Sequence, residues 1–444
     1  MKRRPNISRR DLLTSGSALA LGAVARRTLA AAPAERPQVA AIFTELRHRS
    51  HAYNILMNLM GHCLFRGRRV DPGLDVVSLY ADQFPADDMA REVSRRLDVP
   101  LFGRIEQALC LGGQELAVDA VLLIGEHGDY PTNELGQKLY PRKAFFDQIV
   151  AVMERSRQFV PLFNDKHLSY RWDWSKEMYD RARKRGIPLM AGSSVPLAER
   201  RPPVEMPSAA KVVEAVAIHG GGMESYDFHG LELLQSLIEA RQGGETGVSR
   251  VELVAGDAYA GARADLRWSP SLEQAALAAE RTADFKRQPR PGLRPMPLPA
   301  GKEAGNHALL VTYKDGTRAA VLKIGNSSDR WNLACRLEGR DEPLATAMYN
   351  GPWGNFNLFS ALSHAIAHFF RSGQAPYPVE RTLLVSGVLD AAMHSHHAGR
   401  PIDTPHLEFG YKPQDFRAFR ETGESWKVVT VDTPQPTKFQ PKKP

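Results

Sequence analysis

The sequence predicts an α/β fold: a Rossmann-like, doubly wound parallel sheet followed by an α+β domain with a mainly antiparallel open sheet. Three short apolar runs, residues 118–124, 159–163 and 187–190, carry the first half of this prediction, and each stops at a polar cluster. Apolar runs bounded by turn residues and alternating with helical stretches are typical of buried strands in parallel sheets. Ligands bind outside the carboxyl ends of such strands, so the polar clusters are the candidate site.

Residues 1–34 are predicted to be a twin-arginine (Tat) signal peptide rather than part of the fold. Residues 8–13 (SRRDLL) have the twin-arginine pattern, small apolar residues follow over 15–25, and residues 32–34 (APA) form an A-x-A cleavage site. The apolar run is too short for a stable membrane span. We therefore expect a periplasmic or otherwise exported protein. The alternative to a signal peptide is a flexible basic N-terminus.

The net charge and the cysteine spacing limit the kinds of partner and metal site that the sequence predicts. The net charge is +8, and the first 34 residues hold seven basic residues and one acidic residue, a net of +6, which leaves +2 for the rest. A nearly neutral body has no electrostatic footprint for nucleic acid. The three cysteines, Cys63, Cys110 and Cys335, are far apart and predict neither a disulfide framework nor a thiolate zinc site.

The first domain is expected over residues 35–203 and alternates strands with helices. Its first strand covers 39–43, and after a turn Ser50 is placed to cap the following helix. A second strand over 74–80 ends near Asp82. Further helices are expected, in chain order, over 89–97, 142–157 and 175–184, between the apolar runs.

An α+β domain is expected over residues 204–350, followed by C-terminal helices and a closing segment over 351–433. The strands expected in the second domain are 212–219, 251–256, 309–313, 319–324 and 332–338, with one helix over 231–241. The two later helices are expected over 357–371 and 379–394. Residues 434–444 are rich in proline and lysine and are expected to form a disordered tail.

Several of these features together resemble the Gfo/Idh/MocA family of glucose–fructose oxidoreductases and inositol dehydrogenases, of which this chain looks like a divergent, export-tagged branch. They are the acidic end of the second strand at Asp82, the run 118–124, the segment 165–167 (DKH) where the family has Glu-Lys-Pro, and 229–232 (HGLE), which resembles His-x-x-Asp. The resemblance implies an oxidoreductase that uses NAD or NADP and acts on a carbohydrate or polyol.

The resemblance and the strand ends together give the expected site. Lys166, Asp165, His229 and Glu232 are the expected catalytic residues, with Lys166 and His229 handling the substrate proton and Glu232 orienting His229. The residues expected to hold substrate are Glu126, His127, His167 and Asn164. Those expected to contact the dinucleotide are Thr44, Arg47, Ser50, His51, Asp82 and Gly125.

The first turn departs from the family pattern. Residues 43–51 (FTELRHRSH) contain no glycine, whereas a dinucleotide fingerprint needs glycines for its tight turn and for close approach to the pyrophosphate. Ser50 and the helix N-terminus, with Arg47 and Arg49, remain able to meet a phosphate. Binding of NAD or NADP and its loss are therefore both open.

Two alternatives to the oxidoreductase follow from the same residues. One is a non-redox carbohydrate-binding protein that has lost the dinucleotide. The other is a metal-assisted sugar lyase or isomerase using Glu126, Asp165, His167 and His229. These four are dispersed in the sequence, and no spacing rule selects them, so no metal site is assigned. A homo-oligomer is expected only by family analogy.

Overall fold

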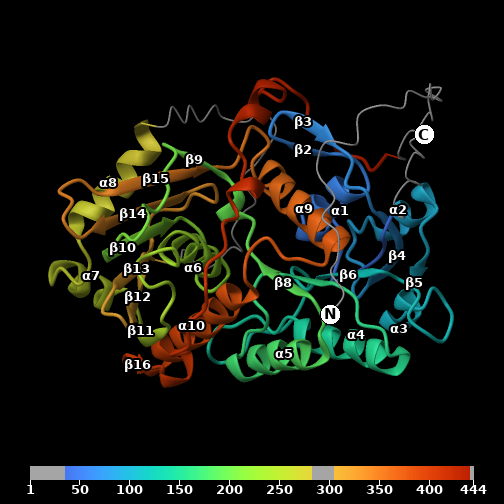
Figure 1. Cartoon of the computed structure of the whole chain (residues 1–444), viewed down its shortest axis with the longest axis horizontal. Coiled ribbons are helices and arrows are strands. Elements are labelled where there is room, and N and C mark those ends of the chain that lie inside the picture. Colours follow the sequence, from blue (N-terminus) through green and yellow to red (C-terminus); the bar gives the residue numbers. More distant parts are fainter. Residues whose placement is uncertain (1–35, 283–304, 441–444) are drawn as a thin grey trace, which may run out of the picture. The chain divides into compact units, whose positions relative to one another are not determined.

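Six parallel strands form the first sheet of the computed structural model, which describes residues 36–282 and 305–440 (Figure 1). The strands lie in the order β5 (Leu101–Phe102), β4 (Asp75–Ala81), β1 (Gln38–Phe43), β6 (Ala120–Ile124), β7 (Leu162–Asp165) and β8 (Leu189–Gly192). From β1 the chain adds β4 and β5 on one side, and it then crosses over to add β6, β7 and β8 on the other side. The topological switch point therefore lies between β1 and β6. The predicted doubly wound parallel sheet is confirmed.

Helices alternate with these strands as expected. They are α1 (His51–Leu59), α2 (Ala90–Leu97), α3 (Ile105–Leu109), α4 (Arg142–Ser156) and α5 (Trp172–Arg185). Ser50 is the N-cap of α1, and its hydroxyl accepts a hydrogen bond from the backbone N–H of Tyr53, as predicted. The sequence did not predict the hairpin of β2 (Cys63–Phe65) and β3 (Arg68–Val70), because three-residue strands are too short to show a periodicity.

The second sheet has eight strands in the order β16-β11-β12-β13-β10-β14-β15-β9. Their bounds are β9 (Glu199–Arg201), β10 (Val212–His219), β11 (Val248–Ala255), β12 (His307–Tyr313), β13 (Arg318–Lys323), β14 (Trp331–Leu337), β15 (Leu344–Tyr349) and β16 (Ile402–Asp403). Only β10 and β13 pair in parallel, so this sheet is mainly antiparallel, as predicted. Three of its strands, β9, β15 and β16, were not predicted.

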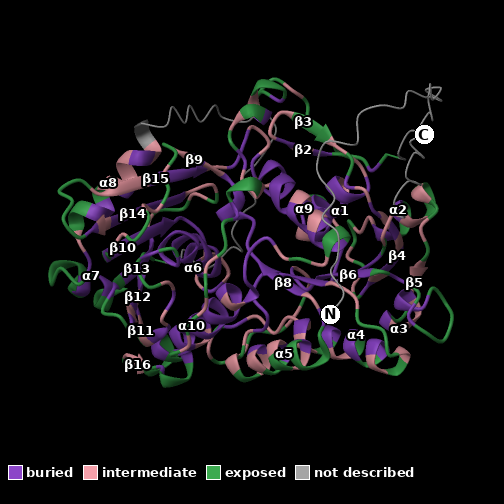
Figure 2. Ribbon diagram, in the orientation of Figure 1, coloured by how far each residue is buried: buried purple, intermediate pink, exposed green. Residues whose placement is uncertain are grey.

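Helices cover this second sheet and join it to the first. They are α6 (Ser225–Ile238), α7 (Asp257–Ala264), α8 (Pro270–Thr282), α9 (Asn355–Ser372) and α10 (Val379–Ala398), and short 3-10 turns occur at Val195–Leu197, Pro405–Leu407, Arg417–Phe419 and Glu424–Lys427. α6 starts before the predicted position, because Glu224 and Asp227 form a capping box there. Figure 2 shows buried residues along α6 and α9.

The C-terminal helices complete the cores of both sheets. Phe356 and Leu362 of α9 share one hydrophobic cluster with Ile55 of α1. α10 contributes Leu384 and other residues to the cluster beneath α6. Among the described helices none is long and apolar enough to cross a membrane.

Residues 434–440 differ from the disorder expected for the tail. Phe439 is 3 % exposed and its ring meets that of Tyr53 edge-on at 5.7 Å. The Tyr53 hydroxyl donates to the backbone oxygen of Pro436 at 3.1 Å, and Arg49 donates to the Gln435 side chain at 2.6 Å. This part of the tail is therefore packed on α1. Residues 1–34, which are predicted to be a signal peptide, and residues 441–444 lie outside the described residues.

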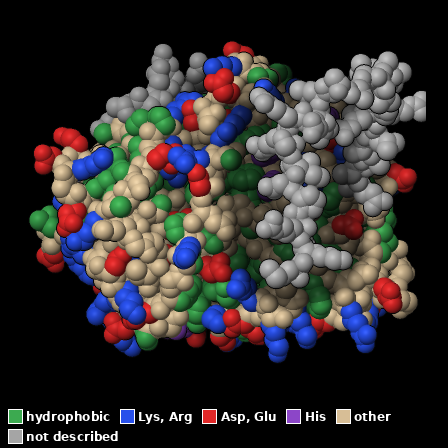
Figure 3. All heavy atoms as spheres, viewed as in Figure 1, with side chains coloured by type: hydrophobic (Ala, Val, Ile, Leu, Met, Phe, Trp, Pro, Cys, Tyr) green, Lys and Arg blue, Asp and Glu red, His purple; other side chains and the backbone are tan. Residues whose placement is uncertain are grey.

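Charged side chains of both signs are interspersed over the described part of the face that Figure 3 views. The described part of this face therefore carries charges of both signs. This mixture agrees with the near-neutral charge of the chain after residue 34.

The packed tail gives a stability prediction. Phe439→Ala is expected to lower the free energy of unfolding by about 3 kcal/mol, because it empties a buried aromatic site against Tyr53. Urea denaturation followed by circular dichroism measures this loss. The control is Lys438→Ala, an exposed neighbour that should change stability by less than about 0.5 kcal/mol. Equal effects of the two substitutions would contradict the packing of the tail.

Candidate active site

The polar clusters after β6 and β7 meet at the switch-point edge of the parallel sheet, with the start of α6 beside them. Lys166 follows β7, and its Nζ lies 3.3 Å from Oε1 of Glu126, which follows β6. The same ammonium donates to the backbone oxygen of Ser225 at 3.1 Å. Lys166 and Glu126 are both buried. The two sheets therefore contribute to one polar centre around Lys166.

Arg142, the first residue of α4, is a member of this centre that the sequence did not predict. Its side chain is fully buried and donates to Oε2 of Glu126 and, at 3.0 Å, to Nε2 of His167. Burial alone would raise the pKa of Glu126, but Lys166 and Arg142 outweigh it and hold the pKa well below its ordinary range. Glu126 is thus an ionised carboxylate between two cations.

His167, expected to bind substrate, instead faces Arg142. Because a guanidinium only donates, Nε2 of His167 accepts this hydrogen bond. Burial, and then Arg142, lowers the pKa of His167 well below its ordinary value, so the ring is neutral. In this structure His167 accepts a hydrogen bond from one N–H group of the buried Arg142 guanidinium.

The side chain of His51 reaches the polar centre. It is the first residue of α1, and its Nδ1 is 2.6 Å from Oδ2 of Asp165, the last residue of β7. Its ring is 5.1 Å from that of His127 and meets Phe359 of α9 edge-on at 4.7 Å. Asp165 and His51 therefore form a carboxylate–imidazole pair.

His229 of α6 has a partner other than the expected Glu232. Its Nδ1 is 2.6 Å from the hydroxyl oxygen of Ser193, which follows β8. Burial, and then Lys166, lowers the pKa of His229 well below its ordinary value. Glu232 instead accepts from Thr382 of α10 at 2.7 Å, so it contributes to packing between α6 and α10.

The strand ends also carry unusual backbone. Lys166 and His127 have φ angles of +69° and +72°, in the left-handed region that non-glycine residues avoid. Such conformations cost about 1 to 3 kcal/mol and cluster at functional sites. Asn164 supports the turn by donating to the backbone oxygens of Asp165 and His167 at 3.2 and 3.1 Å, so its amide nitrogen braces the loop.

Several buried polar atoms at the centre have no hydrogen-bond partner among the described residues, among them Nε2 of His127, Nδ1 of His167 and Nε of Arg142. Nε2 of His127 is buried and makes no hydrogen bond. Burial, and then His51, lowers the pKa of His127 to about 3, so the ring is neutral. Buried polar atoms are normally hydrogen-bonded, and a ligand hydroxyl is a group that would supply the missing bond.

The residues expected to contact the dinucleotide make hydrogen bonds and contacts within the chain. Asp82 accepts from the hydroxyls of Tyr80 at 2.9 Å and Tyr130 at 2.5 Å. The Thr44 hydroxyl donates to the backbone oxygen of Glu126 at 2.6 Å. A Cβ on Gly125 would lie 2.6 Å from Cγ of Arg142, so this glycine makes room for the arginine.

A second buried cluster was missed because its members are far apart in the sequence. Nε2 of His219 and of His307 lie 2.9 and 2.8 Å from the same oxygen of Asp227. The backbone N–H of Gly221 donates to Nδ1 of His219, so the proton of that ring is on Nε2. The ligand atoms of His219, Asp227 and His307 lie close enough together to hold a metal ion, but a metal-bound histidine normally donates through its other nitrogen, whereas Nδ1 of His219 accepts.

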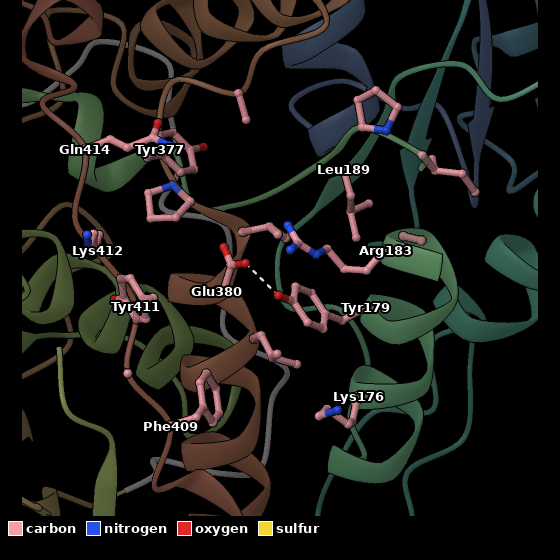
Figure 4. Close-up of a pocket in the computed structure, with 18 of the residues that line it drawn as sticks. Lys176, Tyr179, Arg183, Leu189, Tyr377, Glu380, Phe409, Tyr411, Lys412 and Gln414 are labelled. Atoms are coloured by element: carbon pink, nitrogen blue, oxygen red, sulfur yellow. Dashed lines mark hydrogen bonds between the residues drawn. The ribbon is translucent and has the colours of Figure 1, made fainter. Parts of the chain in front are cut away.

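A cavity of about 900 Å³ lies away from this centre, between α5, the start of α10 and the segment from His406 to Gln414. Figure 4 shows Tyr179 and Arg183 of α5 facing Tyr411, with the Tyr179 hydroxyl donating to Glu380 at 2.6 Å. The residues that line it include none of the expected catalytic residues. The chemistry is therefore assigned to the strand ends.

No family model and no curated protein matches the sequence. Solved structures match it in three dimensions. GenD2 from gentamicin A biosynthesis, in complex with NAD, has a TM-score of 0.51 at 11% identity over 84% of this chain and 97% of its own. For myo-inositol 2-dehydrogenase from Lactobacillus plantarum the TM-score is 0.50 at 10% identity, and the match covers 83% of this chain and 99% of the dehydrogenase. The likeness is one of fold. It supports the two-domain fold that the Gfo/Idh/MocA resemblance implies.

Glu232 gives a pH prediction. Burial raises the pKa of this carboxyl from 4.5 to about 7, so the folded state keeps a proton that the unfolded state loses between these values. Its contribution to stability is fully present below about pH 4.5 and is lost as the pH rises through about 7.

Glu232→Gln, which is neutral at every pH, should therefore gain about 2 to 3 kcal/mol of stability relative to the wild type between about pH 5 and pH 8. Urea denaturation across this range measures the difference. Glu338→Gln, at a carboxylate whose side chain is 61% exposed, is the control and should show no such trend. A pH-independent gain for Glu232→Gln would rule out an elevated pKa.

Proposed function

We propose that this chain is an exported oxidoreductase of the Gfo/Idh/MocA type, which transfers hydride between a nicotinamide dinucleotide and a carbohydrate or polyol. The observation that carries the proposal is the ammonium of Lys166, held by Glu126 and the Ser225 carbonyl at the switch-point edge of a dehydrogenase fold. A buried, fixed cation at this edge suits a reaction in which negative charge develops on a substrate oxygen.

A dinucleotide finds contacts on described residues. The N-terminus of α1 and the partly exposed side chain of Arg47 would face its pyrophosphate, Asp82 its adenosine ribose, and Lys166 its reacting end. When bound, it would supply the hydride acceptor. Export favours a cofactor that stays bound through turnover.

The chain's own residues position the substrate. Lys166 stabilises the alkoxide that forms when a hydroxyl loses its proton. The neutral rings of His127 and His229 offer hydrogen bonds to neighbouring hydroxyls, and Ser193 fixes the orientation of His229. A carbohydrate or polyol, with several hydroxyls in a fixed arrangement, suits these groups.

A non-redox carbohydrate-binding protein is the second candidate, and two observations favour it. The turn before α1 has no glycine, and Asp82 already accepts from Tyr80 and Tyr130. In this form the polar centre would bind a carbohydrate without hydride transfer. For the metal-assisted lyase or isomerase, Glu126, Asp165, His167 and His229 do not converge as ligands in the described part of the chain.

We also propose export by the twin-arginine pathway and a homo-oligomeric assembly. Residues 8–13 and the A-x-A segment support export, and the likeness to the Gfo/Idh/MocA type supports the assembly by analogy alone. Fractionation of an exporting host and sedimentation of the purified protein test the two proposals.

Mass spectrometry decides between the two functions. Full-length protein purified from an exporting host is denatured, and the released small molecules are analysed for NAD and NADP. We expect about one dinucleotide per chain if it is tightly held. If none is released, and added NAD or NADP does not raise the melting temperature, hydride transfer is excluded and the binding function takes its place.

Lys166→Met tests the proposed reaction itself. With NAD and a panel of aldoses and cyclitols that includes myo-inositol, we expect this variant to lower kcat by about 100-fold or more, because the alkoxide loses its cation. The control is Lys211→Met, whose side chain is 56% exposed, and its kcat should match the wild type. Unchanged turnover in a folded Lys166→Met protein would remove Lys166 from the mechanism.

A further inference from the structure

We infer that His51, oriented by Asp165, is the general base of this site and takes the substrate hydroxyl proton at its Nε2. The inference rests on the proposed function, because it assigns a residue to that reaction. It changes two expectations: His51 was expected to contact the dinucleotide, and His229 was expected to move the proton.

The geometry of the pair fixes which nitrogen is free. Asp165 is 1 % exposed, and its Oδ2 lies 2.6 Å from Nδ1 of His51. A carboxylate accepts and does not donate, so Nδ1 carries a hydrogen, and in the neutral ring Nε2 keeps its lone pair. The same arrangement, an imidazole held in one tautomer by a buried carboxylate, activates histidine bases on unrelated folds.

Residues of α1, β7 and α9 together position the His51 imidazole at the polar centre. His51 begins α1, Asp165 ends β7, and Phe359 of α9 packs edge-on against the ring at 4.7 Å. The ring lies 5.1 Å from that of His127 and 6.3 Å from that of His229. A hydroxyl bound between these histidines would therefore be within reach of His51.

The other basic groups of the centre are less suited to accept a proton. The Lys166 ammonium already donates to Glu126 and to the Ser225 carbonyl, so it is held as a cation. The pKa of His127 is lowered to about 3, and that of His229 lies well below its ordinary value, in both cases first through burial. Neutral rings with such low pKa values are weak bases.

The proton transfer is balanced in charge and atoms. The substrate O–H bond breaks, its proton forms a bond to Nε2 of His51, and the electron pair stays on the oxygen as an alkoxide. The Asp165 carboxylate stabilises the resulting imidazolium, and the Lys166 ammonium stabilises the alkoxide. The two ion pairs are therefore formed on consecutive residues at the end of β7.

Turnover of three variants tests the assignment, on whichever member of the aldose and cyclitol panel the wild type oxidises. His51→Gln is expected to lower kcat by about 100-fold or more with KM within about threefold. Asp165→Asn should be more damaging than Asp165→Ala, because the asparagine amide donates to Nδ1 and places the proton on Nε2. His48→Gln, an exposed histidine of the same turn, is the matched control.

A second measurement needs neither substrate nor dinucleotide. Diethylpyrocarbonate acylates neutral imidazole nitrogens, and peptide mass spectrometry gives the rate at each histidine. We expect Asp165→Asn to slow acylation of His51 by about fivefold or more, because Nε2 then carries the proton. His394, whose side chain is 54% exposed, is the internal reference and should react equally in both proteins.

The two measurements separate this inference from the proposed function. If no dinucleotide is found, hydride transfer is rejected. If acylation of His51 is nevertheless slowed in Asp165→Asn, the pairing of His51 with Asp165 is supported. Unchanged acylation of His51 in Asp165→Asn overturns the inference, as does wild-type turnover by folded His51→Gln. Melting curves for each variant show whether it is folded.

Discussion

The buried ion network of Arg142, Glu126 and Lys166 is the interaction on which the site depends. Removing three charged groups from water is costly, and such a network persists only when each charge has a close partner. Glu126 supplies that partner to both cations, and Gly125 leaves space for the aliphatic stem of Arg142. The network therefore fixes the ends of β6 and β7 relative to α4, and it holds the Lys166 ammonium toward the start of α6.

Much of the fold could be predicted from local sequence patterns. The apolar run 118–124 became β6, the serine before α1 became its cap, and the hairpin joining β12 to β13 appeared where turn residues separate two apolar strands. These features depend on neighbours in the chain. The meeting of Glu126 with Lys166 was also predictable, because parallel strands end at one edge.

The partners within the site could not be predicted in this way. Arg142 opens a helix and looks like an ordinary surface residue in the sequence, yet it is fully buried. Ser193 replaces Glu232 as the partner of His229, and Asp227 binds a histidine 80 residues away. No local periodicity encodes contacts of this kind, since they depend on how the two sheets pack.

The packing of the chain's last described segment on α1 has a consequence for the order of assembly. Arg49, beside His51, donates to Gln435 across 386 residues of sequence and to the carbonyl of Trp353. During synthesis the parallel sheet emerges early, but the turn that precedes His51 acquires its partner Gln435 only after that residue has emerged. A product that stops before residue 435 would therefore possess the sheet while the turn beside His51 still lacked this partner.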